Sequence, residues 1–400
     1  MTELGQRGYV LKKDILWLFL FLVVFVNGFE AGGYQASLYE IGQTYDLSVT
    51  HMGLFASVEL LATMLAPLVL GSWADRTDKL KDILLLLVVQ ALFALSVFFS
   101  TKQMVFVVGI FFLGLTTSAL QFIAIAALAD RYPVSGKKKI GFITSMYAFG
   151  ALVAPLIISY YLKRNVDWRA LFLMIAAGTI IAIVGITVSK NGEEEKAEGT
   201  KEETEGYGNF VLIGVLLLCV VMFIYVGFEN GFAFFVDTLF TDVFKSSLGK
   251  YALSLFWAVM IPSRILVGYF SRYSQKILLA SVIAIPVVTA ALSLAPNGYV
   301  VMALCIPLSL ACGAIYPCVL TTVLKFTGGK TATATGMITV STGLGGVVFT
   351  ALTGILAGAF GVRYAILSLA GFYIFSIISV IAVIRKGDSL KLSAQRQEAP

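Results

Sequence analysis

Two short stretches of the chain carry the same tripeptide: residues 27–32 read NGFEAG and residues 226–231 read VGFENG. Each places a glutamate, Glu30 or Glu229, inside an apolar run, and the two glutamates are 199 residues apart. A carboxylate at the centre of a membrane helix costs about 2.5–3.5 kcal/mol on insertion scales. A chain that accepts this cost at two matching positions is expected to contain two related halves, each with one functional acid.

The composition is typical of a membrane protein. The chain has 400 residues, of which 58% are hydrophobic and 13% charged, and its mean hydropathy is +0.90. A soluble protein usually has about 25% charged residues. The apolar runs are close to the ~20 residues that cross a bilayer as a helix, and lipid requires every backbone group to be paired within the protein. We therefore predict an all-α polytopic membrane protein.

Breaks between the apolar runs divide the chain into twelve predicted membrane-spanning helices. A hydrophilic stretch with seven glutamates, residues 189–208, separates the first six from the last six and predicts a cytoplasmic linker. The predicted domains are therefore an N-terminal half, 1–188, and a C-terminal half with a short tail, 209–400. The predicted spans are 14–39, 50–72, 82–100, 104–128, 140–161, 170–188, 209–239, 250–270, 277–294, 299–324, 334–359 and 364–384.

Basic residues predict the orientation of the chain. If both termini are cytoplasmic, the cytoplasmic segments hold 21 of the 29 Lys and Arg residues and the outer loops hold 7, with Arg264 inside a span. An excess of Lys and Arg in the short loops on one side is the usual mark of the cytoplasmic side. We expect a multi-pass plasma (cytoplasmic) membrane protein with both termini in the cytoplasm.

Further matches between the two halves define an internal repeat. Residues 71–85 have a weaker counterpart in 268–281, an offset of 197, and residues 167–172 correspond to 361–366, an offset of 194. Each span therefore matches the span six places later. A shift of six spans preserves orientation, so the halves are parallel repeats, which favours alternating access around a central site.

The loop after the second span resembles the loop motif of the major facilitator superfamily, G-x-L-A-D-R-x-G-R-[KR]. The matching residues are Gly71, Asp75 and Arg76, whereas Trp73 and Asp78 depart from the motif. The resemblance covers the whole chain and implies the twelve-helix fold and a cytoplasmic gate formed by this loop. Asp75 could stabilise the positive N-terminal end of the eleventh helix, near residues 331–336.

Three shorter motifs resemble the fucose–galactose–glucose:proton symporter branch of that superfamily. They are Tyr225-Val-Gly-x-Glu229, Gly313-Ala-Ile-Tyr316-Pro317 and Ser263-Arg264-x-x-x-Gly268. The resemblance implies proton-coupled sugar uptake. The aspartate that this branch has in its first span is replaced by Glu30, a departure that affects the coupling chemistry.

Three carboxyl groups inside predicted spans are candidates for proton coupling: Glu30, Glu59 and Glu229. Glu59 lies 16 residues before Asp75, about 24 Å along a helix, so it is not part of the cytoplasmic loop. A buried carboxyl group can take up a proton on one side of the membrane and release it on the other. The alternative for each is a structural acid that is hydrogen-bonded across helices.

Polar and aromatic residues near these acids suit a polyhydroxylated ligand. Amides and carboxylates can bond hydroxyl groups while an aromatic ring covers the apolar face of a sugar. Arg264, near the inner end of the eighth span, is expected either to contribute to a cytoplasmic gate or to extend to the membrane interface. The predicted substrate-binding residues are Asn27, Tyr34, Gln121, Asn230, Asp237, Trp257 and Tyr316.

Other functional classes lack their motifs. The sequence has no P-loop, HExxH, GxSxG or metal-spaced cluster, so we expect neither an enzyme nor an ATP-driven pump, and neither a metal nor a cofactor. We predict a monomeric secondary transporter that couples sugar uptake to H⁺ rather than Na⁺ and binds no nucleic acid. The alternatives are a proton-coupled exporter of drug-like or amphipathic compounds, and a ligand sensor that signals through its linker or tail.

Overall fold

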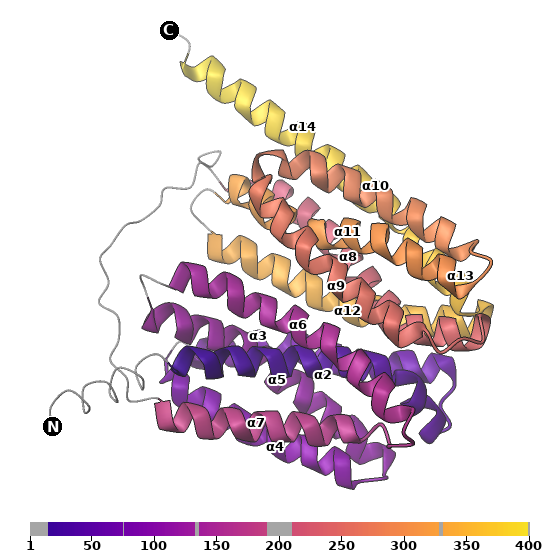
Figure 1. The fold of residues 1–400 in the computed structure, drawn as a ribbon. Coiled ribbons are helices and arrows are strands. Elements are labelled where there is room, and N and C mark those ends of the chain that lie inside the picture. The colour runs from indigo at the N-terminus through magenta and orange to yellow at the C-terminus, as the bar shows by residue number, and fades with distance from the viewer. Residues whose placement is uncertain (1–14, 75, 133–135, 190–209, 328–330, 399–400) are drawn as a thin grey trace, which may run out of the picture. The chain divides into compact units, whose positions relative to one another are not determined.

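The computed structural model describes residues 15–74, 76–132, 136–189, 210–327 and 331–398. Every regular element in these ranges is helical (Figure 1). The described residues contain twelve segments that are long and apolar enough to cross a membrane, and their bounds agree closely with the predicted spans. The predicted fold class is therefore confirmed. The linker 189–208 lies almost entirely outside the described residues.

The helices fall into two sets of six spans. The first set is α2 (Leu16–Thr44), α3 (Val49–Ala74), α4 (Lys79–Phe99), α5 (Gln103–Arg131), α6 (Gly136–Leu162) and α7 (Ala170–Ser189). The second set is α8 (Leu212–Thr238), α9 (Gly249–Tyr269), α10 (Ser274–Ser293), α11 (Gly298–Val323), α12 (Thr331–Phe360) and the pair α13 (Val362–Gly371) and α14 (Tyr373–Glu398). Three short helical turns, η1 (Leu239–Val243), η2 (Ser271–Tyr273) and η3 (Leu324–Phe326), extend or join these helices.

The chain forms two compact units. The first contains residues 1–45 and 58–200, and the second contains residues 46–57 and 201–400. The first turns of α3 therefore belong to the second unit, where Gly53 packs against Gly354 of α12 and the Ser57 hydroxyl donates to the Val347 carbonyl at 3.1 Å. Helix α3 is thus shared between the units.

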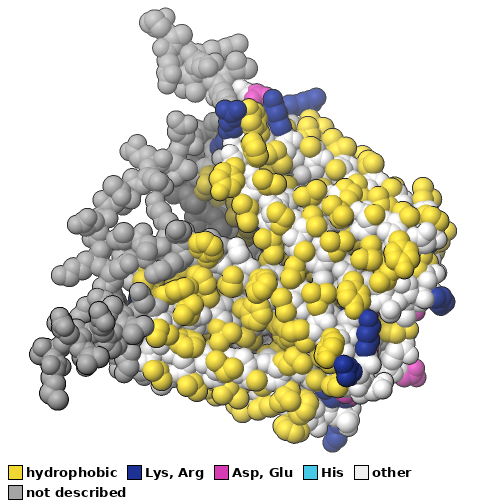
Figure 2. Space-filling view, in the orientation of Figure 1, with side chains coloured by type: hydrophobic (Ala, Val, Ile, Leu, Met, Phe, Trp, Pro, Cys, Tyr) yellow, Lys and Arg dark blue, Asp and Glu magenta, His cyan; other side chains and the backbone are white. Residues whose placement is uncertain are grey.

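The outward faces of the helices are apolar. Large hydrophobic side chains such as Leu92, Val184 and Val287 are more than half exposed. Hydrophobic side chains cover most of the face seen in Figure 2, and the charged side chains lie toward its edges. A soluble protein rarely exposes so much apolar surface, whereas a lipid-facing surface is expected to look like this.

Glycines bring α2 and α6 into direct backbone contact. A methyl group added to Gly28 would lie 1.9 Å from the carbonyl oxygen of Tyr147, and one added to Gly32 would lie 2.4 Å from that of Ala151. On α6, a methyl group on Gly150 would lie 2.2 Å from the carbonyl oxygen of Phe25. Small residues spaced four apart are the usual device for close helix packing in membranes.

The second unit repeats this contact between α8 and α12. Gly227 packs against the ring of Phe349 and Gly231 against the hydroxyl of Thr353, both at 2.5 Å from an added methyl group. On α12, a methyl group on Gly345 would lie 2.0 Å from the Phe223 carbonyl oxygen. The repeated motif is thus G-F-E-x-G rather than the tripeptide alone.

This packing explains where the two glutamates point. Each glutamate follows the first glycine of its motif by two residues, which is about 200° around a helix. The glycines face α6 or α12, so Glu30 and Glu229 face the opposite side of their helices. The repeat therefore serves packing and acid placement together.

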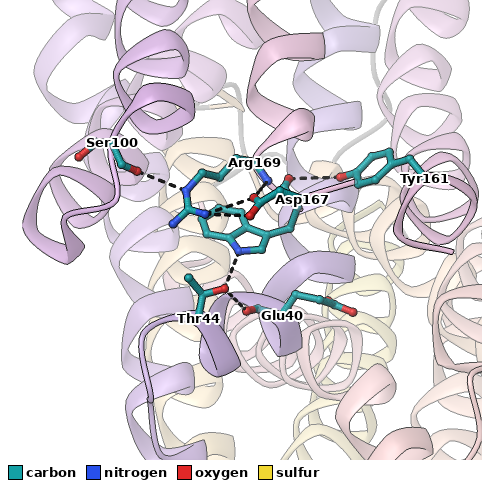
Figure 3. Close-up of polar contacts among 7 residues, drawn as sticks. Glu40, Thr44, Ser100, Tyr161, Asp167 and Arg169 are labelled. Carbon is teal, nitrogen blue, oxygen red and sulfur yellow. Dashed lines mark hydrogen bonds and ion pairs between the residues drawn. The ribbon is translucent and has the colours of Figure 1, made fainter. Parts of the chain in front are cut away.

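A second repeated contact lies at the ends of the helices, on the side that we predict to be extracellular. At the start of α7, Arg169 stacks on Trp168, with its Cζ atom 4.5 Å from the ring centroid, and its Nε donates to the carbonyl of Ser100 at the end of α4 (Figure 3). The Trp168 indole N–H donates to the hydroxyl of Thr44, the last residue of α2, at 2.8 Å. These contacts join the ends of three helices of the first unit.

Arg363 makes the corresponding contacts in the second unit. Its guanidinium donates to the carbonyl of Ala295, just after α10, at 3.4 Å, and it lies 4.9 Å from the ring centroid of Phe244, just after η1. The two arginines are aligned by the 194-residue offset. Each donates a hydrogen bond to a backbone carbonyl at the end of the third helix of its set. This shared geometry supports the internal repeat independently of the glycine contacts.

Asp78, which replaces the glycine of the family loop motif, caps helix α4. Its carboxylate accepts hydrogen bonds from the backbone N–H groups of Leu80 at 3.0 Å and Lys81 at 3.4 Å. An aspartate at this position typically stabilises a helix by about 1 kcal/mol. The departure from the motif therefore has a structural reason.

The twelfth span differs from the single helix predicted over 364–384. It is divided at Phe372, where the chain forms the i→i+3 hydrogen bonds Phe372 N to Leu369 O and Phe375 N to Phe372 O. Such bonds tighten the chain locally and interrupt the α-helical ladder. Helix α14 then continues to Glu398, so most of the predicted tail is helical.

Candidate functional site

The first unit contains a buried polar cluster in which four helices meet. Its members lie in the middle of apolar spans and are at most 3% exposed. Polar side chains in membrane spans usually mark functional positions, because an unpaired polar group is costly in an apolar environment. The cluster consists of Asn27 and Glu30 on α2, Gln90 on α4, Thr117 on α5 and Thr179 on α7.

Hydrogen bonds connect these side chains into one network. The Asn27 amide Nδ2 donates to the backbone carbonyl of Thr117 at 3.0 Å, and its Oδ1 accepts from Gln90 Nε2 at 3.1 Å. Gln90 Nε2 also donates to the Thr117 hydroxyl at 3.3 Å, and Gln90 Oε1 accepts from the Thr179 hydroxyl at 3.1 Å. The amide of Asn27, which we predicted to bind substrate, is thus hydrogen-bonded to other groups of the protein.

Glu30 lies at the end of this network. Its side chain is completely buried, and its Oε2 atom accepts a hydrogen bond from the Thr117 hydroxyl at 3.5 Å. Its Oε1 atom has no hydrogen-bond partner among the described residues. One long hydrogen bond does not repay the cost of burying a carboxylate, so this position suits a group that exchanges a proton.

Glu59 on α3 is the second acid of the first unit. It is 3% exposed, and its side chain packs against Gly114 of α5, where an added methyl group would lie 3.0 Å from the Glu59 Cγ atom. Glu59 is near enough to Glu30 for the two carboxylates to repel each other when both are charged. The structure therefore brings two of the three predicted coupling acids together.

The third predicted acid, Glu229, lies in a different setting within the second unit. It is 8% exposed and interacts electrostatically with Arg264 of α9 and with Tyr225 one turn away on α8. Arg264 interacts with the Tyr225 hydroxyl as well. Arg264, predicted as a gate residue or an interfacial cation, is therefore the counter-charge to a buried acid. Tyr225, Cys312 and Tyr373 complete the buried part of this cluster.

The two glutamates of the repeat thus differ in electrostatics. Glu30 faces a second carboxyl group, whereas Glu229 faces a guanidinium. An opposite charge nearby stabilises an ionised carboxylate and a like charge destabilises it. The repeat therefore holds one acid with a like charge beside it and one with an opposite charge, which is a division of roles that sequence equivalence does not suggest.

The remaining predicted substrate-binding residues are placed as follows. The Asn230 side chain donates to the Val226 carbonyl of its own helix at 2.9 Å and is half-buried. Tyr34 is completely buried against Phe106, with ring centroids 6.1 Å apart. Trp257 is buried, Gln121 is half-buried and Tyr316 is 40% exposed. Their roles in substrate binding remain predictions.

Asp237, also predicted to bind substrate, forms a buried ion pair at the end of α8. Its Oδ2 atom lies 2.5 Å from Nζ of Lys250 on α9, and the two side chains are 5% and 10% exposed. Its Oδ1 atom lies against Gly249, where an added methyl group would be 2.4 Å away. The charge of Asp237 is therefore balanced within the protein and fastens α8 to α9.

We expect Lys250→Met and Asp237→Asn each to destabilise the protein by about 3–5 kcal/mol, because either change removes the charge that balances a buried charged partner. The double variant should recover much of the loss. Thermal unfolding of the purified protein in detergent measures this cycle, with Lys245→Met, a change at an exposed lysine between η1 and α9, as the control. If the single variants unfold at the same temperature as the Lys245→Met protein, the ion pair contributes nothing to stability.

The predicted cytoplasmic gate is only partly described. Asp75 lies outside the described residues. Arg76 is exposed, and its backbone N–H donates to the Trp73 carbonyl at 3.0 Å. A methyl group added to Gly71 would have no atom within 4 Å. A gating role for Gly71, Asp75, Arg76 and Arg264 remains a prediction.

Sequence reasoning missed Gln90, Thr117 and Thr179. Gln90 offered the clearest signal, because apart from Ser96 it is the only polar residue in the run from Ile83 to Phe99. A lone glutamine in such a run is expected to face a protein partner rather than lipid. The two threonines gave no comparable signal, since a threonine in a membrane helix often bonds only the backbone of its own helix.

Comparison with known proteins identifies the family. The model of the Major Facilitator Superfamily matches residues 20–350. The chain therefore belongs to the major facilitator superfamily of membrane transporters, as the loop motif and the repeat indicated.

Individual relatives are distant in sequence. The chain is 25% identical over 378 residues to the glucose/mannose transporter GlcP of Bacillus subtilis (strain 168). The aligned region covers 89% of this chain and 88% of the relative. It is 24% identical over 224 residues to a TsgA homolog of Buchnera aphidicola subsp. Schizaphis graminum (strain Sg), covering 54% and 56% of the two chains.

Solved structures share the fold at low sequence identity. A bacterial homolog of the human lysosomal transporter Spinster, in an inward-facing and unoccupied conformation, has a TM-score of 0.79 at 14% identity and covers 95% of this chain and 98% of its own. The POT family transporter PepTSo has a TM-score of 0.73 at 12% identity and covers 94% and 98%. At this identity the likeness defines the fold alone.

Proposed function

We propose that this transporter is a proton-coupled symporter that takes up a hexose or a similar small neutral sugar by alternating access. The observation that carries the proposal is the pair of buried carboxyl groups, Glu30 and Glu59, in the first unit. Its B. subtilis relative is a glucose/mannose transporter, which supports a sugar as the solute.

In the proposed mechanism Glu30 carries the proton, and Glu229 balances the charge of Arg264 in the second half. Glu30 has a like charge beside it, so protonation relieves both its burial cost and the repulsion. Glu229 has Arg264 beside it, and this opposite charge favours its ionised form. The two halves, residues 1–188 and 209–400, would then rock about the binding site with residues 189–208 as a cytoplasmic tether.

We further propose that the protein lies in the plasma (cytoplasmic) membrane with both termini in the cytoplasm. The distribution of Lys and Arg supports this, with 21 in the predicted cytoplasmic segments and 7 in the outer loops. This orientation places the contacts of Trp168 and Arg169 on the outer side, where protons enter during uptake.

The test is the pH change in lightly buffered suspensions of energy-depleted cells that express the protein, on addition of single sugars. Alkalinisation with D-glucose or D-mannose is expected, because each sugar taken up brings a proton with it. Replacing Na⁺ by choline should leave the signal intact, since H⁺ is the proposed coupling ion. A protein that is folded but silent with every hexose would contradict the proposal and favour export of amphipathic compounds.

A further inference from the structure

The buried network in the first unit has a defined hydrogen-bond direction. It starts at the backbone carbonyl of Thr117, which can only accept a hydrogen bond. Asn27 must therefore present its Nδ2 group to that carbonyl, which turns its Oδ1 toward Gln90. An acceptor at this point requires Gln90 to present Nε2, so that its Oε1 faces Thr179, whose hydroxyl must donate. One fixed acceptor thus determines both amide orientations.

The same logic determines where the Thr117 proton goes. The Thr117 oxygen receives an N–H from Gln90 at 3.3 Å, so one of its lone pairs is occupied. A hydroxyl group has a single proton to donate, and the acceptor within reach in the network is Glu30 Oε2 at 3.5 Å. The hydrogen bonds from Thr179 to Gln90, from Gln90 to Thr117 and from Thr117 to Glu30 therefore all point the same way.

We propose that Gln90 and Thr117 are positioning residues that keep an O–H donor directed at Glu30 and so assist release of its proton during each transport cycle. This inference rests on the proposed function. A donor aimed at a carboxyl oxygen stabilises the ionised carboxylate more than the neutral acid, which itself needs an acceptor for its own O–H. The repulsion from Glu59 favours uptake of a proton by Glu30. The network opposes this effect, because its donor favours release of the proton.

The proton balance is simple. When solute and proton leave on the cytoplasmic side, the Glu30 O–H bond breaks and the proton passes to water. The electron pair stays on the carboxylate, which accepts the Thr117 O–H. No other bond changes. For net uptake this release must occur once in every cycle, whereas exchange of one sugar molecule for another lets the carrier return loaded and still protonated.

Few other ionisable groups face Glu30. Glu59 comes from α3, and Tyr34 lies one turn further along α2. Helix α7 has no ionisable side chain, and neither has the spanning part of α5, Gln103–Leu128. The ionisable residues of α4 are confined to its first turn, and Tyr147 of α6 contacts α2 at Gly28, on the side of α2 opposite Glu30. The effect of a substitution in the network on proton release can therefore be attributed to Glu30 and Glu59.

The test compares two activities of the purified protein in liposomes, each with radiolabelled D-glucose. The first is net uptake driven by an imposed pH gradient, and the second is counterflow against unlabelled D-glucose at equal pH. We expect the ratio of net uptake to counterflow to fall about tenfold in Thr117→Val and in Gln90→Leu, the effect of losing one hydrogen bond to a charged group. Thr117→Ser, which keeps the donor, should restore the ratio.

The chain offers a matched control one residue away. Thr116 is also completely buried on α5, but its hydroxyl donates to the Phe112 carbonyl of its own helix at 2.8 Å. Thr116→Val should keep the wild-type ratio. If Thr117→Val behaves like Thr116→Val while Glu30→Gln loses net uptake, the inference is wrong and the proposed function stands. If Glu30→Gln still accumulates sugar, or the wild-type protein takes up none, both are wrong.

Discussion

Glu30→Gln is expected to abolish net uptake and accumulation of sugar, leaving only the exchange of one sugar molecule for another across the membrane. The amide has nearly the shape of the neutral acid and cannot lose a proton, so the carrier would stay in its protonated form. Gradient-driven uptake into liposomes measures the loss.

Two further variants make this result specific. Glu40→Gln changes the same chemical group on the same helix, ten residues closer to its end at Thr44, and should retain accumulation (Figure 3). Glu229→Gln removes the counter-charge of Arg264 and should reduce uptake and counterflow together, because it disturbs the second half rather than proton release alone. A Glu30→Gln protein that concentrates sugar as the wild type does would exclude Glu30 as the proton carrier.

Gly28→Ala is expected to prevent folding of the first half. The new methyl group would lie 1.9 Å from the Tyr147 carbonyl oxygen and 2.6 Å from its carbonyl carbon, and both atoms belong to backbone that cannot turn aside. Helices α2 and α6 would have to separate along their whole contact, which we expect to cost about 3 kcal/mol, the upper end of the usual cost of overpacking. The yield of monodisperse protein after detergent extraction, and its thermal unfolding, measure the effect.

Gly371→Ala is the matched control for the glycine prediction. An added methyl group there meets no atom within 4 Å, so this protein should fold as well as the wild type. Gly345→Ala should resemble Gly28→Ala, since its methyl group would lie 2.0 Å from the Phe223 carbonyl oxygen in the second unit. A Gly28→Ala protein that is extracted and melts like Gly371→Ala would show that the two helices are not in backbone contact.

Much of the architecture could be predicted from local patterns. The length of an apolar run decides whether it spans a bilayer, and this is a property of adjacent residues. The repeat also needed no tertiary information, because aligning residues 27–32 with 226–231 compares the chain only with itself. The division of the last span at Phe372 was not predicted, because it depends on two local hydrogen bonds that interrupt an otherwise continuous apolar run.

The candidate site was predictable only in part. Glu30, Glu59 and Glu229 stood out because a carboxylate in an apolar span is costly wherever it points. Asn27 was also identified, but as a ligand for sugar, and the structure engages its amide with Gln90 and Thr117. Asp237 similarly proved to be paired with Lys250. In both cases the partner comes from another helix, and the pairing depends on how the helices are rotated against each other.

The amino-acid sequence by itself determined that this chain is a twelve-helix membrane protein made of two parallel repeats. The reason is that the lengths of the apolar runs and the similarity between the two halves can be found by comparing residues along the chain. Only the tertiary structure decided that the two equivalent glutamates differ. Glu30 meets Glu59 and a line of donors from Gln90 and Thr117, whereas Glu229 meets Arg264. The physical reason is that electrostatic interactions and hydrogen bonds depend on distances between side chains of different helices, which are set by the packing of those helices against each other.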